Sequence, residues 1–103
     1  MMGYMLNTYR TRALARAALG RYAKRHGHTA LAYMGDDRAS ITHSTKYYRC
    51  RDCHLTAHVT REGNIYSYNI ELGECAEVAA AARARYGEIE FSSIRARYWN
   101  TAR

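Results

Sequence analysis

The chain has 103 residues, a formal net charge of +7 and a pI of about 9.6. This length suits one domain with a small core, and no apolar run is long enough to span a membrane. The N-terminal residues lack the uninterrupted apolar core of a secretory signal. We therefore expect a single cytoplasmic domain over 1–103, in which 87–103 form an accessory tail.

The charge is distributed unevenly along the chain. Residues 1–61 contain nine Arg and two Lys against three Asp, a net of +8, whereas residues 62–103 contain five Arg against six Glu, a net of −1. Such asymmetry predicts a basic face that would meet phosphates, an acidic partner or an anionic surface. The excess of Arg over Lys, together with the many Ala residues, is also typical of a GC-rich genome.

Residues 7–25 predict a helix that Asn7 or Thr8 would cap and Gly27 would end. Basic side chains would occupy much of its remaining surface. Its expected apolar side comprises Leu6, Tyr9, Ala13, Leu14, Ala17 and Ala18.

Residues 29–45 carry weaker signals and predict a loop or short strand, with a turn at 34–37. Residues 46–49 then predict a strand that leads into Cys50.

A β-hairpin is predicted after Cys53. Apolar and polar residues alternate on both sides of the turn at 62–64. The residues expected to share the buried face are Leu55, Ala57 and Val59 on one strand and Tyr66, Tyr68 and Ile70 on the other.

A second helix is predicted over 74–86, with Gly87 at its end. Beyond it, 89–91 alternate like an edge strand, while Ser92 or Ser93 would cap a short helix carrying Ile94, Tyr98 and Trp99.

The three cysteines are the most informative residues for chemistry. Cys50 and Cys53 form a Cys-x-x-Cys turn, and Cys75 would lie in the first turn of the second helix. Three thiolates and one imidazole complete a tetrahedral Zn²⁺ site, whereas three cysteines cannot all pair as disulfides. We predict His28 as the fourth ligand because it follows Gly27 at a helix end, with His26 as the alternative.

The remaining histidines compete less well for the fourth position. His54 is adjacent to Cys53, so the chain would have to fold back to place its ring on the same ion. His58 shares a strand face with His54, and His43 lies in the weakly patterned segment. Because three thiolates and an imidazole leave no open coordination position, we expect a structural zinc ion and no enzymatic activity.

Two other chemistries use the same residues. The sequence from Cys50 to His54 matches the Cys-x-x-Cys-His motif of covalent haem attachment, but that chemistry requires export, and it leaves Cys75 without a purpose. A thioredoxin-like redox pair would place the motif at a helix N-terminus, whereas a hairpin follows it here.

These elements predict an α+β fold: a small zinc-ribbon or treble-clef-like module with an N-terminal helix, a hairpin bearing the Cys-x-x-Cys knuckle, and a second helix. The order of residues 25–28, the Cys50–Cys53 turn, a Gly-containing hairpin and residues 73–75 resembles short zinc-ribbon-like proteins of bacteriophages and high-GC bacteria. The group usually has Gly where this chain has His54. The resemblance implies a phage-like accessory protein with a Cys3His zinc site.

Basic and aromatic residues gather in sequence beside the knuckle and at the hairpin tip. They are Lys46, Tyr47, Tyr48, Arg49, Arg51 and Arg61. Arginines bind phosphates and tyrosines stack on bases, so we predict a nucleic-acid-binding surface. The alternative is a non-enzymatic inhibitor or adaptor that docks on a host protein or ribonucleoprotein complex, such as a CRISPR defence system, because exposed Tyr and Arg also form protein-binding hot spots. The many Tyr residues expected at the surface and the tail around Trp99 are compatible with a homodimer.

Overall fold

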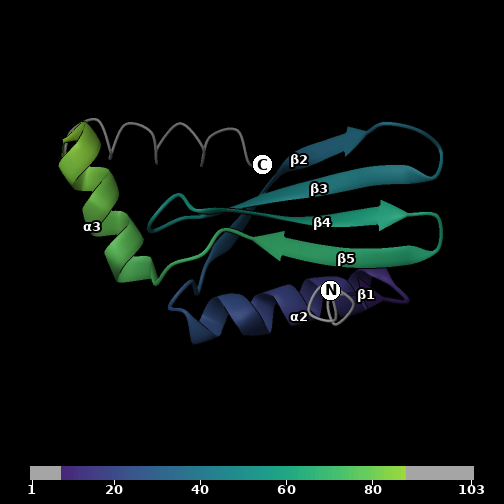
Figure 1. Cartoon of the computed structure of the whole chain (residues 1–103), viewed down its shortest axis with the longest axis horizontal. Helices are drawn as coiled ribbons and strands as arrows, with labels where there is room; N and C mark the ends of the chain where they lie inside the picture. Colours follow the sequence, from purple (N-terminus) through teal and green to yellow (C-terminus); the bar gives the residue numbers. More distant parts are fainter. Residues whose placement is uncertain (1–7, 88–103) are drawn as a thin grey trace.

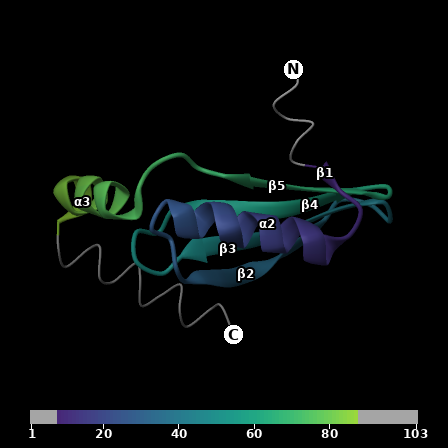
Figure 2. The same cartoon turned by 90° about the horizontal axis from the view of Figure 1, so that it is seen from below.

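The computed structural model describes residues 8–87, which form an α+β fold with a five-stranded antiparallel sheet and two helices (Figure 1). In chain order the elements are β1 (Thr8–Tyr9), α2 (Arg12–Arg25), β2 (Leu31–Arg38), β3 (His43–Cys50), β4 (Thr56–Glu62), β5 (Ile65–Ile70) and α3 (Cys75–Tyr86). The strand order is β1-β5-β4-β3-β2. Helix α2 runs along the sheet, and α3 lies beyond its end (Figures 1 and 2). Neither described helix is long and apolar enough to cross a membrane.

Helix α2 begins later than the sequence predicts. The side chain of Thr11 accepts a hydrogen bond from the backbone N–H of Leu14 at 3.1 Å, which makes Thr11 the N-cap. Thr8 and Tyr9 instead form β1, in register with Ser67 and Tyr66 of β5. The predicted start was wrong because pairing at the sheet edge overrides the helix propensity of these residues.

The apolar side expected for the first helix was also wrong in part. Helix α2 buries Ala15, Ala18, Leu19 and Ala23 against the sheet. Of the expected residues that lie in α2, Ala18 is buried, whereas Ala13, Leu14 and Ala17 are exposed. Leu6 lies outside the described residues. Alanines occur all round this helix, so its small-residue pattern does not fix one face. Packing of the large side chain of Leu19 selects the buried face.

Residues 29–45 contain more regular secondary structure than the sequence predicts. It supplies β2 and the start of β3, which pair in an antiparallel hairpin. The predicted turn at 34–37 is instead part of β2, where the register shifts between Tyr33 and Gly35. Such a β-bulge adds one residue to a strand and produces a local break in its alternation. The pattern therefore looked like a turn.

The central hairpin matches its prediction. Strands β4 and β5 pair from Ala57 with Ile70 to Glu62 with Ile65, around a turn at 63–64. The alternation places Ala57 and Val59 in the core with Leu19 of α2. Tyr66, Tyr68 and Ile70 pack against the same core as predicted.

The second helix also agrees with the sequence. Glu74 is the N-cap of α3 and Gly87 its C-cap. The alternatives proposed for residues 89–99 lie outside the described residues.

A carboxylate just after β5 ties this strand to the start of β4. One oxygen of Glu71 accepts hydrogen bonds from the backbone N–H and the hydroxyl of Thr56, both at 2.7 Å. The backbone hydrogen bond from Thr56 is the main cause that lowers the pKa of Glu71 below its ordinary value of 4.5. The ionised carboxylate therefore stabilises the folded state at pH values above this ordinary pKa.

We expect Glu71→Gln to lower the free energy of unfolding, because the ionised carboxylate accepts stronger hydrogen bonds than an amide oxygen. The folded-state pKa lies below the unfolded one, so the difference from wild type should be full at pH 7 and vanish as the pH falls through the folded-state pKa. Urea unfolding at several pH values measures this difference. Asp37→Asn, at an exposed position of β2, is the control; an effect of Glu71→Gln that does not shrink as the pH falls below 4.5 would contradict the assignment.

Candidate metal centre

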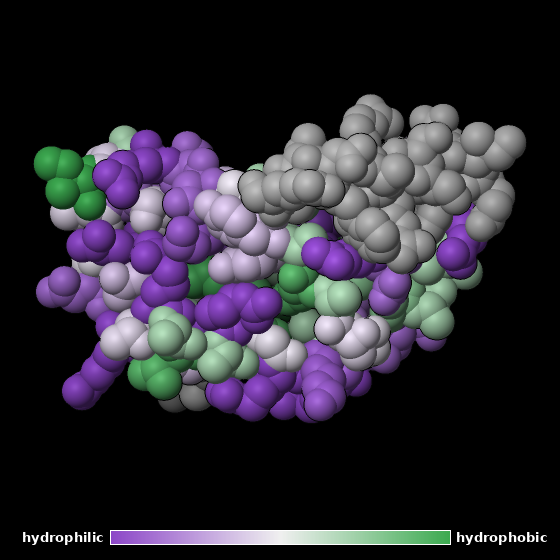
Figure 3. Space-filling view, turned by 180° about the vertical axis from the view of Figure 1, so that it is seen from behind, coloured by the Kyte–Doolittle hydropathy of each residue, from purple (hydrophilic) through white to green (hydrophobic). Residues whose placement is uncertain are grey.

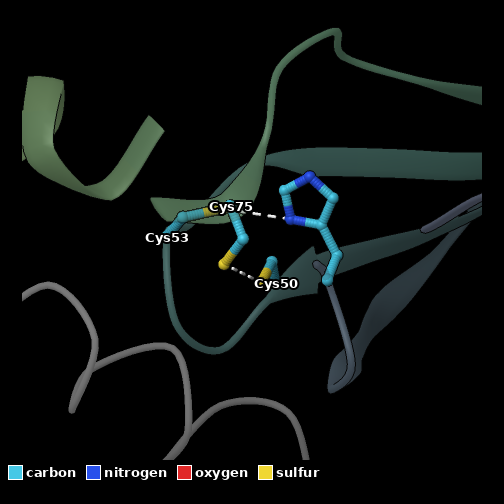
Figure 4. Close-up of side chains that lie close together, drawn as sticks. Cys50, Cys53 and Cys75 are labelled. Atoms are coloured by element: carbon cyan, nitrogen blue, oxygen red, sulfur yellow. Dashed lines mark hydrogen bonds between the residues drawn. The ribbon is translucent and has the colours of Figure 1, made fainter. Parts of the chain in front are cut away.

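Four side chains from three separate parts of the chain meet at one end of the sheet. One donor atom from each of His28, Cys50, Cys53 and Cys75 lies within 4.8 Å of all the others. Cys50 ends β3, Cys53 follows in the connection to β4, and Cys75 begins α3. The cysteine side chains converge on one point (Figure 4).

The sulfur and nitrogen atoms of this cluster lie close together but form no covalent bond with one another. The sulfurs of Cys50 and Cys75 are 3.9 Å apart, and the sulfur of Cys53 lies 3.4 Å from Nδ1 of His28. A disulfide would need a sulfur separation of about 2.0 Å, and all three cysteines are free. His28, Cys50 and Cys53 are at most 2% exposed, so the centre is sheltered from water.

The C-terminus of α2 positions His28. The backbone N–H of His28 donates to the carbonyl of Ala23 at 2.8 Å, and that of Gly27 donates to Lys24 at 3.1 Å. These two bonds form a Schellman motif with Gly27 at its left-handed position, φ +84°. The predicted helix stop at Gly27 is confirmed, and it directs the next residue into the cluster.

A hydrogen bond from the chain before α3 fixes the orientation of the His28 ring. Nε2 of His28 lies 2.8 Å from the carbonyl oxygen of Gly73, which can only accept, so Nε2 carries the proton. Nδ1 is then left with its lone pair directed towards Cys53. A backbone partner of this kind is the usual outer-shell support of a metal-binding imidazole.

The start of α3 is held against the end of α2. The backbone N–H of Cys75 donates to the carbonyl of His26 at 2.9 Å, and Nδ1 of His26 lies 2.5 Å from a carboxylate oxygen of Glu74. A side chain at Gly27 would place its Cβ 3.3 Å from the Cβ of Cys75. The absence of a side chain at Gly27 thus allows this close approach.

The knuckle between β3 and β4 has its own backbone hydrogen bonds. The N–H of Cys50 donates to Leu55 at 2.8 Å, and the N–H of His54 donates back to Cys50 at 2.9 Å. His54 takes a positive φ of 69°, which lets the chain turn into β4. These bonds direct both sulfurs inward.

The thiols strongly affect one another's ionisation. The hydrogen bond from the Cys53 thiol is the main cause that lowers the pKa of Cys50 to about 4. The same bond, with burial, raises the pKa of Cys53. Burial and then the charge of Cys50 raise the pKa of Cys75. Three thiolates this close repel one another, so a cation among them would stabilise the fully ionised cluster.

The other histidines have different surroundings. His26, the alternative ligand, pairs with Glu74 and lies 4.5 Å from the ring of Tyr22. His43 lies 3.6 Å from Glu62 at the far end of β3, and His58 lies 6.0 Å from the ring of Tyr47. Burial lowers the pKa of His58.

The residues predicted as one partner-binding surface are divided by the fold. Lys46 and Tyr48 face α2, whereas the alternation of β3 places Tyr47 and Arg49 on the opposite face. Tyr48 is 9% exposed and belongs to the core, so its ring is closed to a base. Arg49 donates to the carbonyl of His54 at 2.9 Å.

The two remaining arginines of that set lie at opposite ends of the sheet. Arg51 follows β3 beside the metal centre, while Arg61 pairs in register with Ser44 near the other end. The strand rise places them about 24 Å apart along the sheet. Sequence reasoning missed Gly73, whose carbonyl supports His28, and Tyr33, which shares a groove with Lys46.

No protein-family model, no curated protein and no solved structure matches this chain.

Proposed function

We propose that His28, Cys50, Cys53 and Cys75 bind one Zn²⁺ ion, in a zinc-ribbon or treble-clef-like arrangement of knuckle and helix start. The cluster geometry carries this proposal. A tetrahedral zinc ion would separate two sulfur ligands by about 3.8 Å, and a sulfur and a nitrogen by about 3.6 Å. The observed separations of 3.9 Å and 3.4 Å agree with these values.

The proposed ion has a structural role. Four protein ligands leave no position for water or substrate, and the three thiolates weaken the metal as a Lewis acid. Helix α3 buries only Ala79 fully, and its partly buried Val78 and Ala82 pack beside the cluster. This limited packing would hold α3 weakly, so the ion would tie α3 to the sheet and to the end of α2.

The zinc-stabilised domain is proposed to bind nucleic acid. Helix α2 supports this, because its 14 residues include Arg12, Arg16, Arg21, Lys24 and Arg25 and no acidic residue. Such a concentration of cations on one exposed element binds phosphates and favours nucleic acids over neutral partners.

Native mass spectrometry of protein purified without added metal tests the zinc site. We expect one zinc ion per chain, and a cobalt-substituted sample should show the absorption of a tetrahedral centre with three thiolates.

Filter binding should detect nucleic acid with an affinity that falls steeply with salt. A chain that folds without metal would contradict the zinc site. A specific protein partner with no affinity for nucleic acid would instead support the inhibitor or adaptor function.

A further inference from the structure

One flank of α2 lines two adjoining grooves against β2 and β3. The first, of about 500 Å³, includes Arg12, Arg16, Tyr33 and Lys46 in its lining. The second, of about 360 Å³, shares Arg16 and continues to Lys24. The helix cations are four and eight residues apart, so they follow one side of α2. We name Arg12, Arg16, Lys24 and Lys46 the basic track.

The first groove combines these cations with an open aromatic ring. The Tyr33 side chain is 41% exposed, and Nζ of Lys46 lies 5.3 Å from its ring centre. The Arg16 guanidinium lies 4.8 Å from the ring centre of Tyr48, which holds it along the groove wall. Asp36 pairs with Lys46 at 3.1 Å from the rim. Within the described residues, neither groove lining includes an acidic side chain.

We propose that the basic track binds single-stranded nucleic acid, with phosphates on its cations and a base stacked on Tyr33. This assignment rests on the proposed nucleic-acid function and gives it a location and a strand preference. From Arg12 to Lys24 the helix rises about 18 Å, which is long enough to follow several phosphates. A base in a duplex is already stacked on its neighbours, whereas a single strand can present one to an aromatic ring.

Seen from behind, the described residues present a largely hydrophilic surface with apolar residues between them (Figure 3).

Fluorescence anisotropy with labelled 12-nucleotide single-stranded DNA and RNA tests the location. We expect Arg12→Gln/Arg16→Gln to weaken binding at least tenfold at 0.1 M salt. The slope of log affinity against log salt should fall by about 1.4, because two phosphate contacts are lost. The matched control is Arg21→Gln/Arg25→Gln, which removes the same charge from the same helix on the flank near Tyr68. The control should retain most of the affinity.

Arg12 and Arg16 also contact core tyrosines, so their replacement would also remove packing contacts. A second charge variant therefore distinguishes weaker binding from misfolding. Lys24→Gln/Lys46→Gln should weaken binding similarly while thermal melting stays near wild type. Tyr33→Leu should weaken binding at least fivefold through lost stacking, whereas Tyr33→Phe, which keeps the ring, should bind like wild type.

The possible outcomes distinguish failure of the basic track as the binding site from failure of the nucleic-acid-binding function as a whole. Wild-type protein that binds no oligonucleotide would overturn both the nucleic-acid function and the track. Wild-type binding that the control variant weakens as much as the track variants would overturn the track alone. A duplex of the same sequence that binds as tightly as the single strand would overturn the strand preference.

Discussion

Replacing Cys50 with serine should abolish the proposed zinc binding and unfold the domain at 25 °C. Cys50 is 1% exposed and lies between Cys53 and Cys75, so no other described side chain can take its place in the cluster. Structural zinc sites contribute apparent free energies of about 10–16 kcal/mol near neutral pH. A typical domain is stable by only about 5–15 kcal/mol, so loss of the ion outweighs the remaining interactions. Native mass spectrometry and circular dichroism measure both losses.

Leu55→Ala is the matched control for this result. Leu55 is 3% exposed and packs in the same cluster as Cys50 and Cys53, but it offers no ligand atom. Its truncation should cost about 2–5 kcal/mol and leave one zinc ion per chain. Cys50→Ser protein that melts like wild type without metal would show that packing, and not zinc, holds this end of the fold.

The sequence could predict the parts of the fold that depend on local patterns. The β4–β5 hairpin was predictable because alternation on both strands and a turn with Gly63 and Asn64 act over few residues. Strand β1 depends on a partner almost sixty residues away, where Thr8 meets Ser67. No local pattern reports such pairing. The bulge at Gly35 likewise interrupts the alternation along β2, so the sequence pattern indicated a turn there.

The candidate metal centre shows the same division between local and long-range features. Spacing alone indicated Cys50 and Cys53, and the helix stop at Gly27 indicated His28, which the structure places beside both. The bond between His28 and Gly73, and the pair between His26 and Glu74, join residues 45 and 48 positions apart. They arise only when the exit from β5 meets the end of α2, so they could not be read from the sequence.

The residues predicted to bind a partner lie on different faces of the sheet for a simple geometric reason. Neighbouring residues on a strand point to opposite faces, so the cluster of Lys46, Tyr47 and Tyr48 in sequence is not a cluster in space. Helical spacing of four residues does keep Arg12 and Arg16 together.

Gly73→Ala should destabilise the domain although no metal ligand changes. Gly73 has φ +132°, and an added Cβ would lie 2.6 Å from Cγ2 of Val78. The backbone strain and the overlap each cost about 1–3 kcal/mol, which together predict a loss of about 2–6 kcal/mol in the free energy of unfolding. Zinc affinity should also fall by about 10–100-fold, because the Gly73 carbonyl orients the ring of His28.

The double variant Gly73→Ala/Val78→Ala separates the two causes. Removing the Val78 methyl groups relieves the overlap, so the two substitutions should couple favourably by about 1–3 kcal/mol in a double-mutant cycle. The strain at position 73 remains, so the double variant should still bind zinc more weakly than Val78→Ala alone. Chemical unfolding and competition with a chelator measure the two quantities. Equal zinc affinity in these two proteins would mean that the Gly73 carbonyl supports the fold of this segment without orienting the imidazole.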